Sequence, residues 1–359
     1  MIDLTDYDAI LVVSYGGPMG PDDVLPFMRN ATAGRGVPDE RLREVSTHYE
    51  RYGGVSQINA CNAQLVDDLR TELARRGCEL PVVLGNRNWH PFVTDTLREL
   101  HAAGRHRILL TTTAAYASYS GCRQYREDVG AALATLAAEG IDTSVFTIHK
   151  TRAYYGEEGF LVANVDALVA AAADLPADDA ECRIVFVTHS IPQGMQDASG
   201  PSPELRYVAQ HEQVAERVAS RANAALGRDL AWDLVYCSRS GAPHHPWLEP
   251  DVNDHLAALP EAGVTAVVVA PIGFISDHME VVNDLDFEAA NSAAEAGLAF
   301  SRAATAGTHP AFISSLVDVL AERAQIARGQ RGQDERWSTP CAEGCCLARP
   351  GYEPLPALS

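Results

Sequence analysis

The sequence has no excess of basic residues, no leader-like N-terminus and no long apolar run. Its 359 residues carry 28 Lys and Arg against 48 Asp and Glu, a net charge of −20. That balance argues against binding nucleic acid or an anionic membrane through charge. The N-terminus, MIDLTDYDAILVV, lacks a positive segment, and the longest near-continuous apolar stretch, residues 264–275, is too short to span a bilayer. We expect a cytoplasmic protein without a membrane span.

Cysteine is sparse along most of the chain and dense near its end. The five scattered cysteines are Cys61, Cys78, Cys122, Cys182 and Cys237. The motif CAEGCC adds Cys341, Cys345 and Cys346. In a reducing compartment three clustered thiols indicate metal ligands rather than disulfides. Zinc and iron–sulfur clusters are each usually bound by four protein ligands. Cys122, in YSGCRQY, is the predicted fourth ligand. The alternative is a tail with incidental thiols.

Short apolar runs alternate with longer stretches of helical period. The runs are residues 9–15, 81–86, 107–113, 144–149, 183–189, 233–238 and 266–272. Unbroken apolar runs separated by helices predict parallel strands that are covered on both faces. The fold class is therefore α/β, of the doubly wound type.

A weak internal repeat predicts two similar domains. LVVSYGGP (11–18) matches VFVTHSIP (185–192), and RILLTTTAAYASYSG matches AVVVAPIGFISDH in the same sense. We expect an N-terminal Rossmann-like domain over residues 1–150 and a second over 151–329. Residues 330–359 are polar and then Pro-rich, and predict an extension held by something other than a core.

Ligands bind at the carboxyl ends of the strands in such sheets, so polar residues there are candidates for chemistry. His189 follows the run IVFVT. It is either a general base or metal ligand, or a histidine that bonds a neighbouring carbonyl.

Acidic residues crowd the segment FISDHMEVVNDLDFE, residues 274–288. On a helix starting near residue 277, Glu280, Asp284 and Glu288 would lie at i, i+4 and i+8 on one face. The helix dipole favours acids only in the first turn, so it does not account for Glu288. A line of carboxylates suits a divalent cation, and a solvated helix face is the alternative.

Seven motifs together resemble the ferrochelatase family, whose members insert ferrous iron into a porphyrin. In chain order they are VVSYGGP, HYERYGGVSQIN, GNRNWHP, YSGCRQY, FVTHSIP, SRSGAPHHPWLEPDV and PIGFISDHMEVVNDLDFE. The resemblance runs from about residue 8 to about residue 320. It is greatest to the coproporphyrin III enzymes that carry a C-terminal [2Fe–2S] motif. It implies two Rossmann-like domains with a porphyrin cleft between them.

The resemblance also implies roles for individual residues. His189 would contact iron and help to remove pyrrole protons, with Glu280 facing it across the macrocycle. Asp284 and Glu288 would continue a metal or proton path. The porphyrin contacts would be Tyr15, Arg35, Ser56 and Tyr125. The [2Fe–2S] ligands would be Cys122, Cys341, Cys345 and Cys346. NATAGRGVPDE offers only Arg35 as a basic residue, fewer than such relatives often have.

The expected reaction is insertion of Fe²⁺ into coproporphyrin III, in haem biosynthesis. Protoporphyrin IX as substrate is the first alternative. A sister chelatase for cobalt or nickel and a non-catalytic haem or iron–sulfur sensor are others. A periplasmic-type metal-binding protein is disfavoured by the N-terminus. We expect a monomer that could hand its product to a downstream enzyme of the haem pathway.

Overall fold

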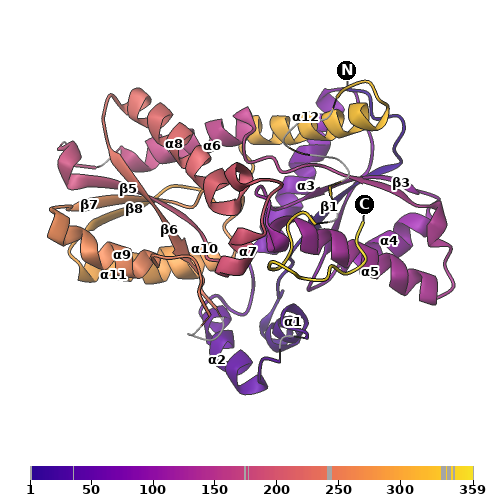
Figure 1. The fold of residues 1–359 in the computed structure, drawn as a ribbon, viewed down its shortest axis with the longest axis horizontal. Coiled ribbons are helices and arrows are strands. Elements are labelled where there is room, and N and C mark those ends of the chain that lie inside the picture. The colour runs from indigo at the N-terminus through magenta and orange to yellow at the C-terminus, as the bar shows by residue number, and fades with distance from the viewer. Residues whose placement is uncertain are drawn as a thin grey trace.

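Two four-stranded parallel sheets form the centres of the two halves of the molecule (Figure 1). The computed structural model describes residues 2–34, 36–173, 175–176, 178–240, 245–332, 337, 341–342 and 344–358. Within these residues the strand orders are β2-β1-β3-β4 and β6-β5-β7-β8. The strands are β1 (Ala9–Ser14), β2 (Val82–Asn86), β3 (Arg107–Thr112), β4 (Thr147–Lys150), β5 (Cys182–His189), β6 (Ala231–Cys237), β7 (Ala266–Ala270) and β8 (Ala299–Arg302).

The strands are apolar on both faces because each face meets a core. In β1, Ile10 and Val12 lie in one hydrophobic cluster, while Ala9, Leu11 and Val13 lie in another. The alternate residues of β5 divide between two clusters in the same way. All seven predicted runs are strands. The eighth strand, β8, was not predicted, because its sequence AFSR is short and only partly buried at the edge of its sheet.

The internal repeat reflects real structural equivalence. β1 and β5, which carry the first pair of matching segments, each bond in parallel to strands on both sides. β3 and β7, which carry the second pair, both stand third in their sheets. The predicted α/β class with two similar halves is confirmed. The domain boundaries at residues 150 and 329 stay predictions.

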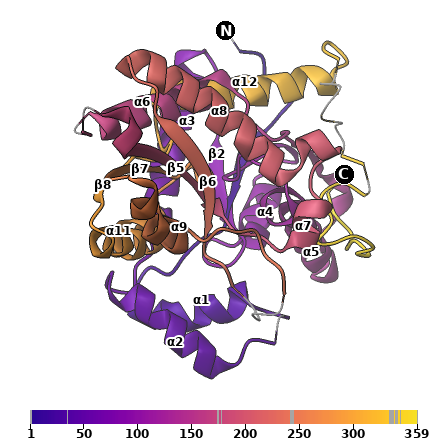
Figure 2. The same ribbon diagram turned by 60° about the vertical axis from the view of Figure 1, so that its left-hand side comes forward.

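Helices cover the sheets on both sides (Figure 2). The helices are α1 (Val24–Ala31), α2 (Asp39–Glu50), α3 (Ile58–Arg75), α4 (Val93–Ala102), α5 (Gln124–Ala138), α6 (Glu158–Ala172), α7 (Gln193–Asp197), α8 (Tyr207–Leu226), α9 (Val252–Ala258), α10 (Met279–Asn283), α11 (Ala290–Glu295) and α12 (Pro310–Ala327). Two π-helices, Tyr119–Arg123 and Asp284–Ala289, precede α5 and α11. In the described residues no helix combines the length and apolar character needed to cross a membrane.

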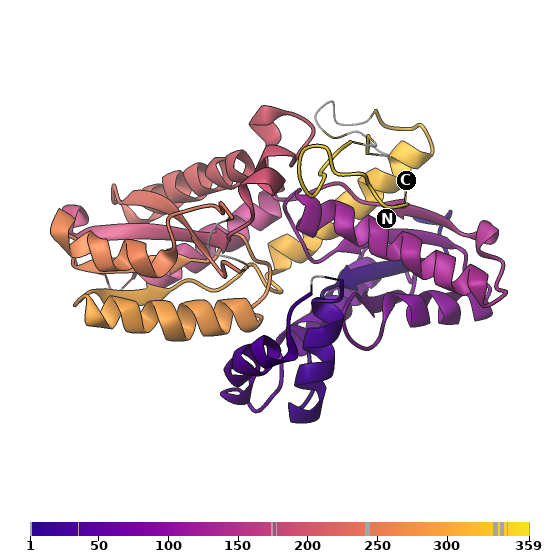
Figure 3. The ribbon, with the colours of Figure 1, turned by 60° about the horizontal axis from the view of Figure 1, so that its bottom comes forward.

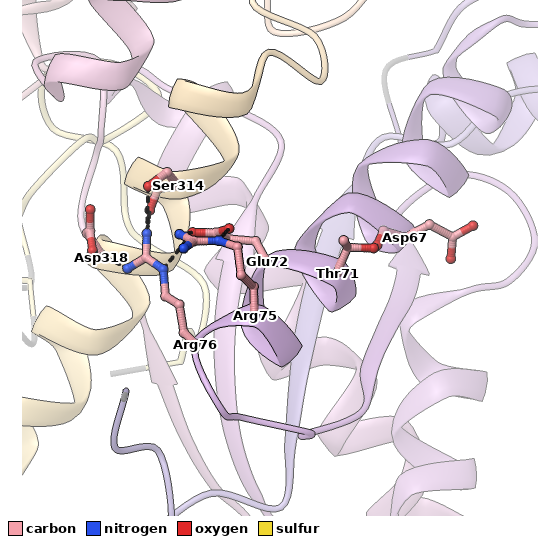
Figure 4. Close-up of polar contacts among 7 residues, drawn as sticks. All are labelled: Asp67, Thr71, Glu72, Arg75, Arg76, Ser314 and Asp318. Carbon is pink, nitrogen blue, oxygen red and sulfur yellow. Dashed lines mark hydrogen bonds and ion pairs between the residues drawn. The ribbon is translucent and has the colours of Figure 1, made fainter.

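Helix α12 ties the end of the second half back onto the first (Figure 4). Arg76, just after α3, donates to Ser314 Oγ at 2.6 Å and lies 2.5 Å from a carboxylate oxygen of Asp318. Glu72 of α3 holds the same guanidinium at 2.6 Å. α12 also packs closely on α6, where a Cβ on Gly159 would lie 1.9 Å from the carbonyl oxygen of Ala311. Only glycine fits at that crossing.

Helices α1 and α2 project from the first half toward the second (Figure 3). Their own small core contains Phe27, Met28 and Leu42. Beyond α2, the hydroxyl of Tyr52 donates to the carbonyl of Val282 in α10 at 3.2 Å. The α1–α2 pair therefore stands opposite the acidic segment of the second half.

The C-terminal tail runs beside α5 and α7 (Figures 1 and 3). The backbone N–H of Leu358 donates to Arg126 in α5 at 3.0 Å, and the Tyr352 ring packs edge-on against Tyr119. Trp337 and Cys346 are buried in the largest hydrophobic cluster. The prediction that something other than a core holds the tail is therefore wrong in part, since two apolar side chains anchor it.

Candidate active site

Side chains from several strand ends in the second half converge at one edge of its sheet. His189 is the last residue of β5, and Ser238 directly follows β6. α10 and the π-helix Asp284–Ala289 follow β7. Parallel strands end at the same edge, which brings these segments together although they are far apart in sequence.

The imidazole of His189 is fixed in one tautomer. Its Nδ1 contacts the carbonyl oxygen of Ser190, which can only accept, so Nδ1 carries the proton and Nε2 is a base. Burial lowers the pKa of His189, and the charge of Glu280 and the bond to Ser190 offset part of that shift. The structure thus shows the bond from His189 to a neighbouring carbonyl, and its role as a base or metal ligand stays a prediction.

Glu280 is paired with His278 near His189. Burial opposes its ionisation, but the charge of His278 and its hydrogen bond to the carboxylate outweigh burial and bring the pKa of Glu280 to about 2. His278 Nδ1 lies 2.9 Å from Glu280 Oε2, and the Glu280 side chain is 37% exposed. The site therefore presents a neutral base and a carboxylate that stays anionic at any physiological pH.

Asp284 lies between Glu280 and Glu288. Burial raises its pKa to about 6, and both neighbouring carboxylates add to the rise, against hydrogen bonds from Ser238 and Asn283. Ser238 donates to Asp284 Oδ2 from a left-handed backbone conformation with φ of 61°, which is uncommon for a residue other than glycine. Glu280 and Glu288 are therefore close enough to act on Asp284, and the role of the three acids as a metal or proton path stays a prediction.

The helix carrying these three acids differs from the expected one. We predicted a regular helix opening near residue 277, but α10 begins at Met279 and gives way at Asp284 to a π-helix. The wider π-turn makes i and i+5 residues neighbours, so Asn283 Nδ2 reaches Glu288 Oε1 at 2.9 Å. The prediction that one regular α-helix carries Glu280, Asp284 and Glu288 is therefore wrong. The charges of Glu280 and Glu288 still act on Asp284.

The predicted porphyrin contacts fall in the first half. Tyr15 follows β1 and packs edge-on against Phe27 of α1 at 6.1 Å between ring centroids. Ser56 is 4% exposed, directly beneath the Gly17 backbone. Tyr125 is also buried, with the Arg87 guanidinium 4.6 Å from its ring centroid. Arg35 lies outside the described residues.

The four predicted cluster cysteines gather where the tail meets the π-helix Tyr119–Arg123. The thiols of Cys341 and Cys346 both contact Cys122, and both contact Cys345. The sulfurs of Cys345 and Cys346 are 3.7 Å apart. Hydrogen bonds from Cys341 and Cys346 hold the pKa of Cys122 well below its usual value, aided by the charge of Lys150. The side chains therefore offer four soft donors in one place, the donor set of an iron–sulfur cluster.

This arrangement is a gathering of thiols rather than a formed metal site. Among the described residues no three His, Cys, Asp or Glu side chains are arranged to hold a metal ion.

A separate pocket of about 460 Å³ is lined in part by Ser190, Tyr236 and Asp251. Its lining includes none of the predicted catalytic, metal-binding or porphyrin-binding residues.

A family model described as Ferrochelatase matches residues 7–324. The chain belongs to the ferrochelatase family. It is 50% identical over 376 residues to the coproporphyrin III ferrochelatase of Streptomyces coelicolor, covering 100% of this chain and 97% of that protein. It is 41% identical over 361 residues to the ferrochelatase of Rhodopirellula baltica, covering 99% and 97% respectively. The predicted family is confirmed.

A solved structure supports the fold. SirB from Bacillus subtilis with Fe³⁺ matches with a TM-score of 0.50 at 13% identity, covering 91% of this chain and 99% of that one. At this identity the likeness speaks only for the fold of paired α/β halves.

Several residues that shape this candidate site lie in polar segments after the strands, but no role was predicted for them. His278 pairs with Glu280, Asn283 and Ser238 hold the acids, and Arg87 covers Tyr125. His278 was within reach of sequence reasoning, because it stands two residues before Glu280 in the acidic motif. Arg87 had a weaker signal, as the residue just after β2 in a polar run.

Proposed function

We propose that this ferrochelatase-family chain inserts Fe²⁺ into coproporphyrin III during haem biosynthesis. The observation that carries the proposal is the family match over residues 7–324, with His189 at the end of β5 and Glu280 in α10 at the same edge of the second sheet. The substrate is inferred from the relative in Streptomyces coelicolor, which is half identical over the whole chain.

The two residues divide the work that insertion requires. A porphyrin must lose two pyrrole protons before iron occupies its centre, and Nε2 of His189 is the group that accepts them. Glu280 supplies the negative charge that holds Fe²⁺ near the ring, because carboxylate oxygen binds hard cations well. Binding the ring in a distorted shape would bring it closer to the transition state than to the resting macrocycle.

Asp284 and Glu288 would carry iron or protons between solvent and Glu280. Tyr49 of α2 lies near these acids, since burial raises its pKa and the charges of Glu280 and Asp284 raise it further. The α1–α2 pair also adjoins Tyr15, while Arg35, Ser56 and Tyr125 complete the proposed propionate contacts.

The choice of porphyrin gives the first prediction. Coproporphyrin III carries four propionates and protoporphyrin IX carries two, so loss of two charged contacts should lower kcat/KM by about 100-fold or more. Anaerobic Fe²⁺ insertion with each porphyrin, followed by absorbance, measures the ratio. A ratio near one, or a preference for protoporphyrin IX, would contradict the proposed substrate.

We also propose that Cys122, Cys341, Cys345 and Cys346 hold a [2Fe–2S] cluster. The gathered thiols and the nearby cation Lys150, 3.5 Å from Cys122, support it. When bound, the cluster would supply a crosslink between the tail and the π-helix Tyr119–Arg123.

The cluster prediction concerns the protein purified without oxygen. Wild type should show visible absorbance bands with about two iron and two sulfide per chain. Cys122→Ser should lose both, whereas Cys78→Ser, at a buried cysteine outside the group, should keep them. Wild type without acid-labile sulfide, or equal loss in both variants, would refute this assignment.

The remaining proposals concern context. We infer a cytoplasmic monomer whose domains divide at residues 150 and 329. Its product would pass to a downstream enzyme of the haem pathway. The net charge of −20 supports only the part of this proposal that keeps the protein off anionic membrane surfaces.

A further inference from the structure

Asn283 is a buried amide at the junction of the two halves. It is 1% exposed and ends α10, just before the π-helix. Its Nδ2 lies 2.9 Å from Glu288 Oε1 and 3.2 Å from Asp284 Oδ1. His48 of α2 is a third neighbour, at 3.4 Å. An amide nitrogen has two hydrogens, so its two shortest contacts place one on each carboxylate.

Arg51 determines which way this amide points. From the residue that follows α2, its Nη1 donates across the junction to Asn283 Oδ1 at 2.9 Å. Because arginine can only donate, the carbonyl of Asn283 must face it and the NH₂ group must face the acids. Arg51 is itself held by the ring of Phe287 in the π-helix, with the guanidinium carbon 3.5 Å from the ring centroid.

This arrangement orients two carboxylates without neutralising them. Adjacent carboxylates repel, and an unsupported pair would separate or share a proton. An arginine in direct contact would fix them but would compete with a cation for their charge. Because the Asn283 amide lies between them, Arg51 fixes the amide and the amide fixes the two carboxylates. The amide is uncharged, so the carboxylates keep their negative charge for binding a cation.

We propose that Asn283 is a positioning residue for the metal path and that Arg51 acts through it, holding Asp284 and Glu288 in place to receive a divalent cation. The inference rests on the proposed function only for the identity of that cation as Fe²⁺. It links the α1–α2 wall, where the porphyrin would bind, to the residues that receive metal.

The test compares Arg51→Met, Asn283→Leu and the double variant with Arg41→Met. Arg41 is an exposed arginine of α2, the helix that Arg51 directly follows, and it pairs with Glu44. In insertion assays the first two should raise the KM for Fe²⁺ roughly tenfold, as outer-shell changes do for metal sites. The KM for porphyrin and the kcat at saturating iron should stay within about twofold. The double variant should be no worse than Asn283→Leu, because Arg51 acts through Asn283. Arg51 is exposed, so its variant should fold even if Asn283→Leu does not.

Calorimetric titration with Mn²⁺, which prefers oxygen ligands over thiols, measures the same property without turnover. Affinity should fall roughly tenfold in Arg51→Met and not in Arg41→Met. Unchanged Mn²⁺ affinity in Arg51→Met, additive effects in the double variant, or an equal rise in porphyrin KM would overturn the inference. If wild type inserted no iron, the proposed function would be wrong. The present inference would still stand if Mn²⁺ affinity fell as expected in Arg51→Met.

Discussion

Replacing Glu280 by glutamine is expected to lower the rate of iron insertion by about 100- to 1,000-fold while coproporphyrin III still binds. Glutamine keeps the shape of the side chain and removes the negative charge that His278 stabilises on Glu280. Only iron insertion, which needs an anion beside the metal, should become slower, and porphyrin binding should not change. Steady-state insertion gives kcat, and quenching of protein fluorescence gives the porphyrin dissociation constant.

Asp286→Asn is the matched control for this prediction. Asp286 lies in the same acidic motif and is also a carboxylate, but it pairs with Arg302 on the surface. Losing an exposed pair of this kind costs about 1 kcal/mol or less, so activity should remain close to that of wild type. If Glu280→Gln retained near-normal turnover, Glu280 would have no role in holding the metal.

Replacing His189 by asparagine is expected to reduce kcat by about 100- to 10,000-fold, the usual range for loss of a general base. Asparagine can still donate to the Ser190 carbonyl from the position of Nδ1, but it has no atom equivalent to Nε2. The substitution therefore separates the structural bond from the proton-accepting function. Stopped-flow absorbance with saturating Fe²⁺ and coproporphyrin III measures the effect.

His255→Asn serves as the comparison for the histidine variant. His255 is partly buried on α9 and pairs with Asp233 at 3.2 Å, away from the predicted residues. Both variants should keep the melting temperature within a few degrees of wild type. Equal losses of activity in the two, or full activity in His189→Asn, would show that the base lies elsewhere.

The pattern of apolar runs predicted the architecture well, because whether a central parallel strand forms depends on the residues within that strand. A parallel strand buried on both faces must be apolar throughout, as the fully buried AILVVS of β1 is. The edge strand β8 has no such requirement, and AFSR accordingly gave no signal. The repeat of β1 in β5 was readable for the same reason: both stand between two other strands.

The site was predictable only where residues lie close in sequence or carry a family motif. His189 and Glu280 came from their motifs and positions after strands. The π-helix Asp284–Ala289 was not predictable, because the order of acidic residues in the sequence is the same whether the turn is an α-turn or a wider π-turn. The bond between Arg51 and Asn283 joins residues 232 positions apart and depends on how the halves meet. Sequence spacing carries no information about such a contact.

The measurement that tests the central claim most directly is the number of iron atoms that one protein molecule inserts. Purified protein is mixed anaerobically with excess Fe²⁺ and coproporphyrin III, and the metallated product is quantified against protein. We predict product many-fold in excess of protein, formed at a rate proportional to enzyme concentration. Product that stops at one equivalent or less would indicate a binding protein and would contradict catalytic insertion.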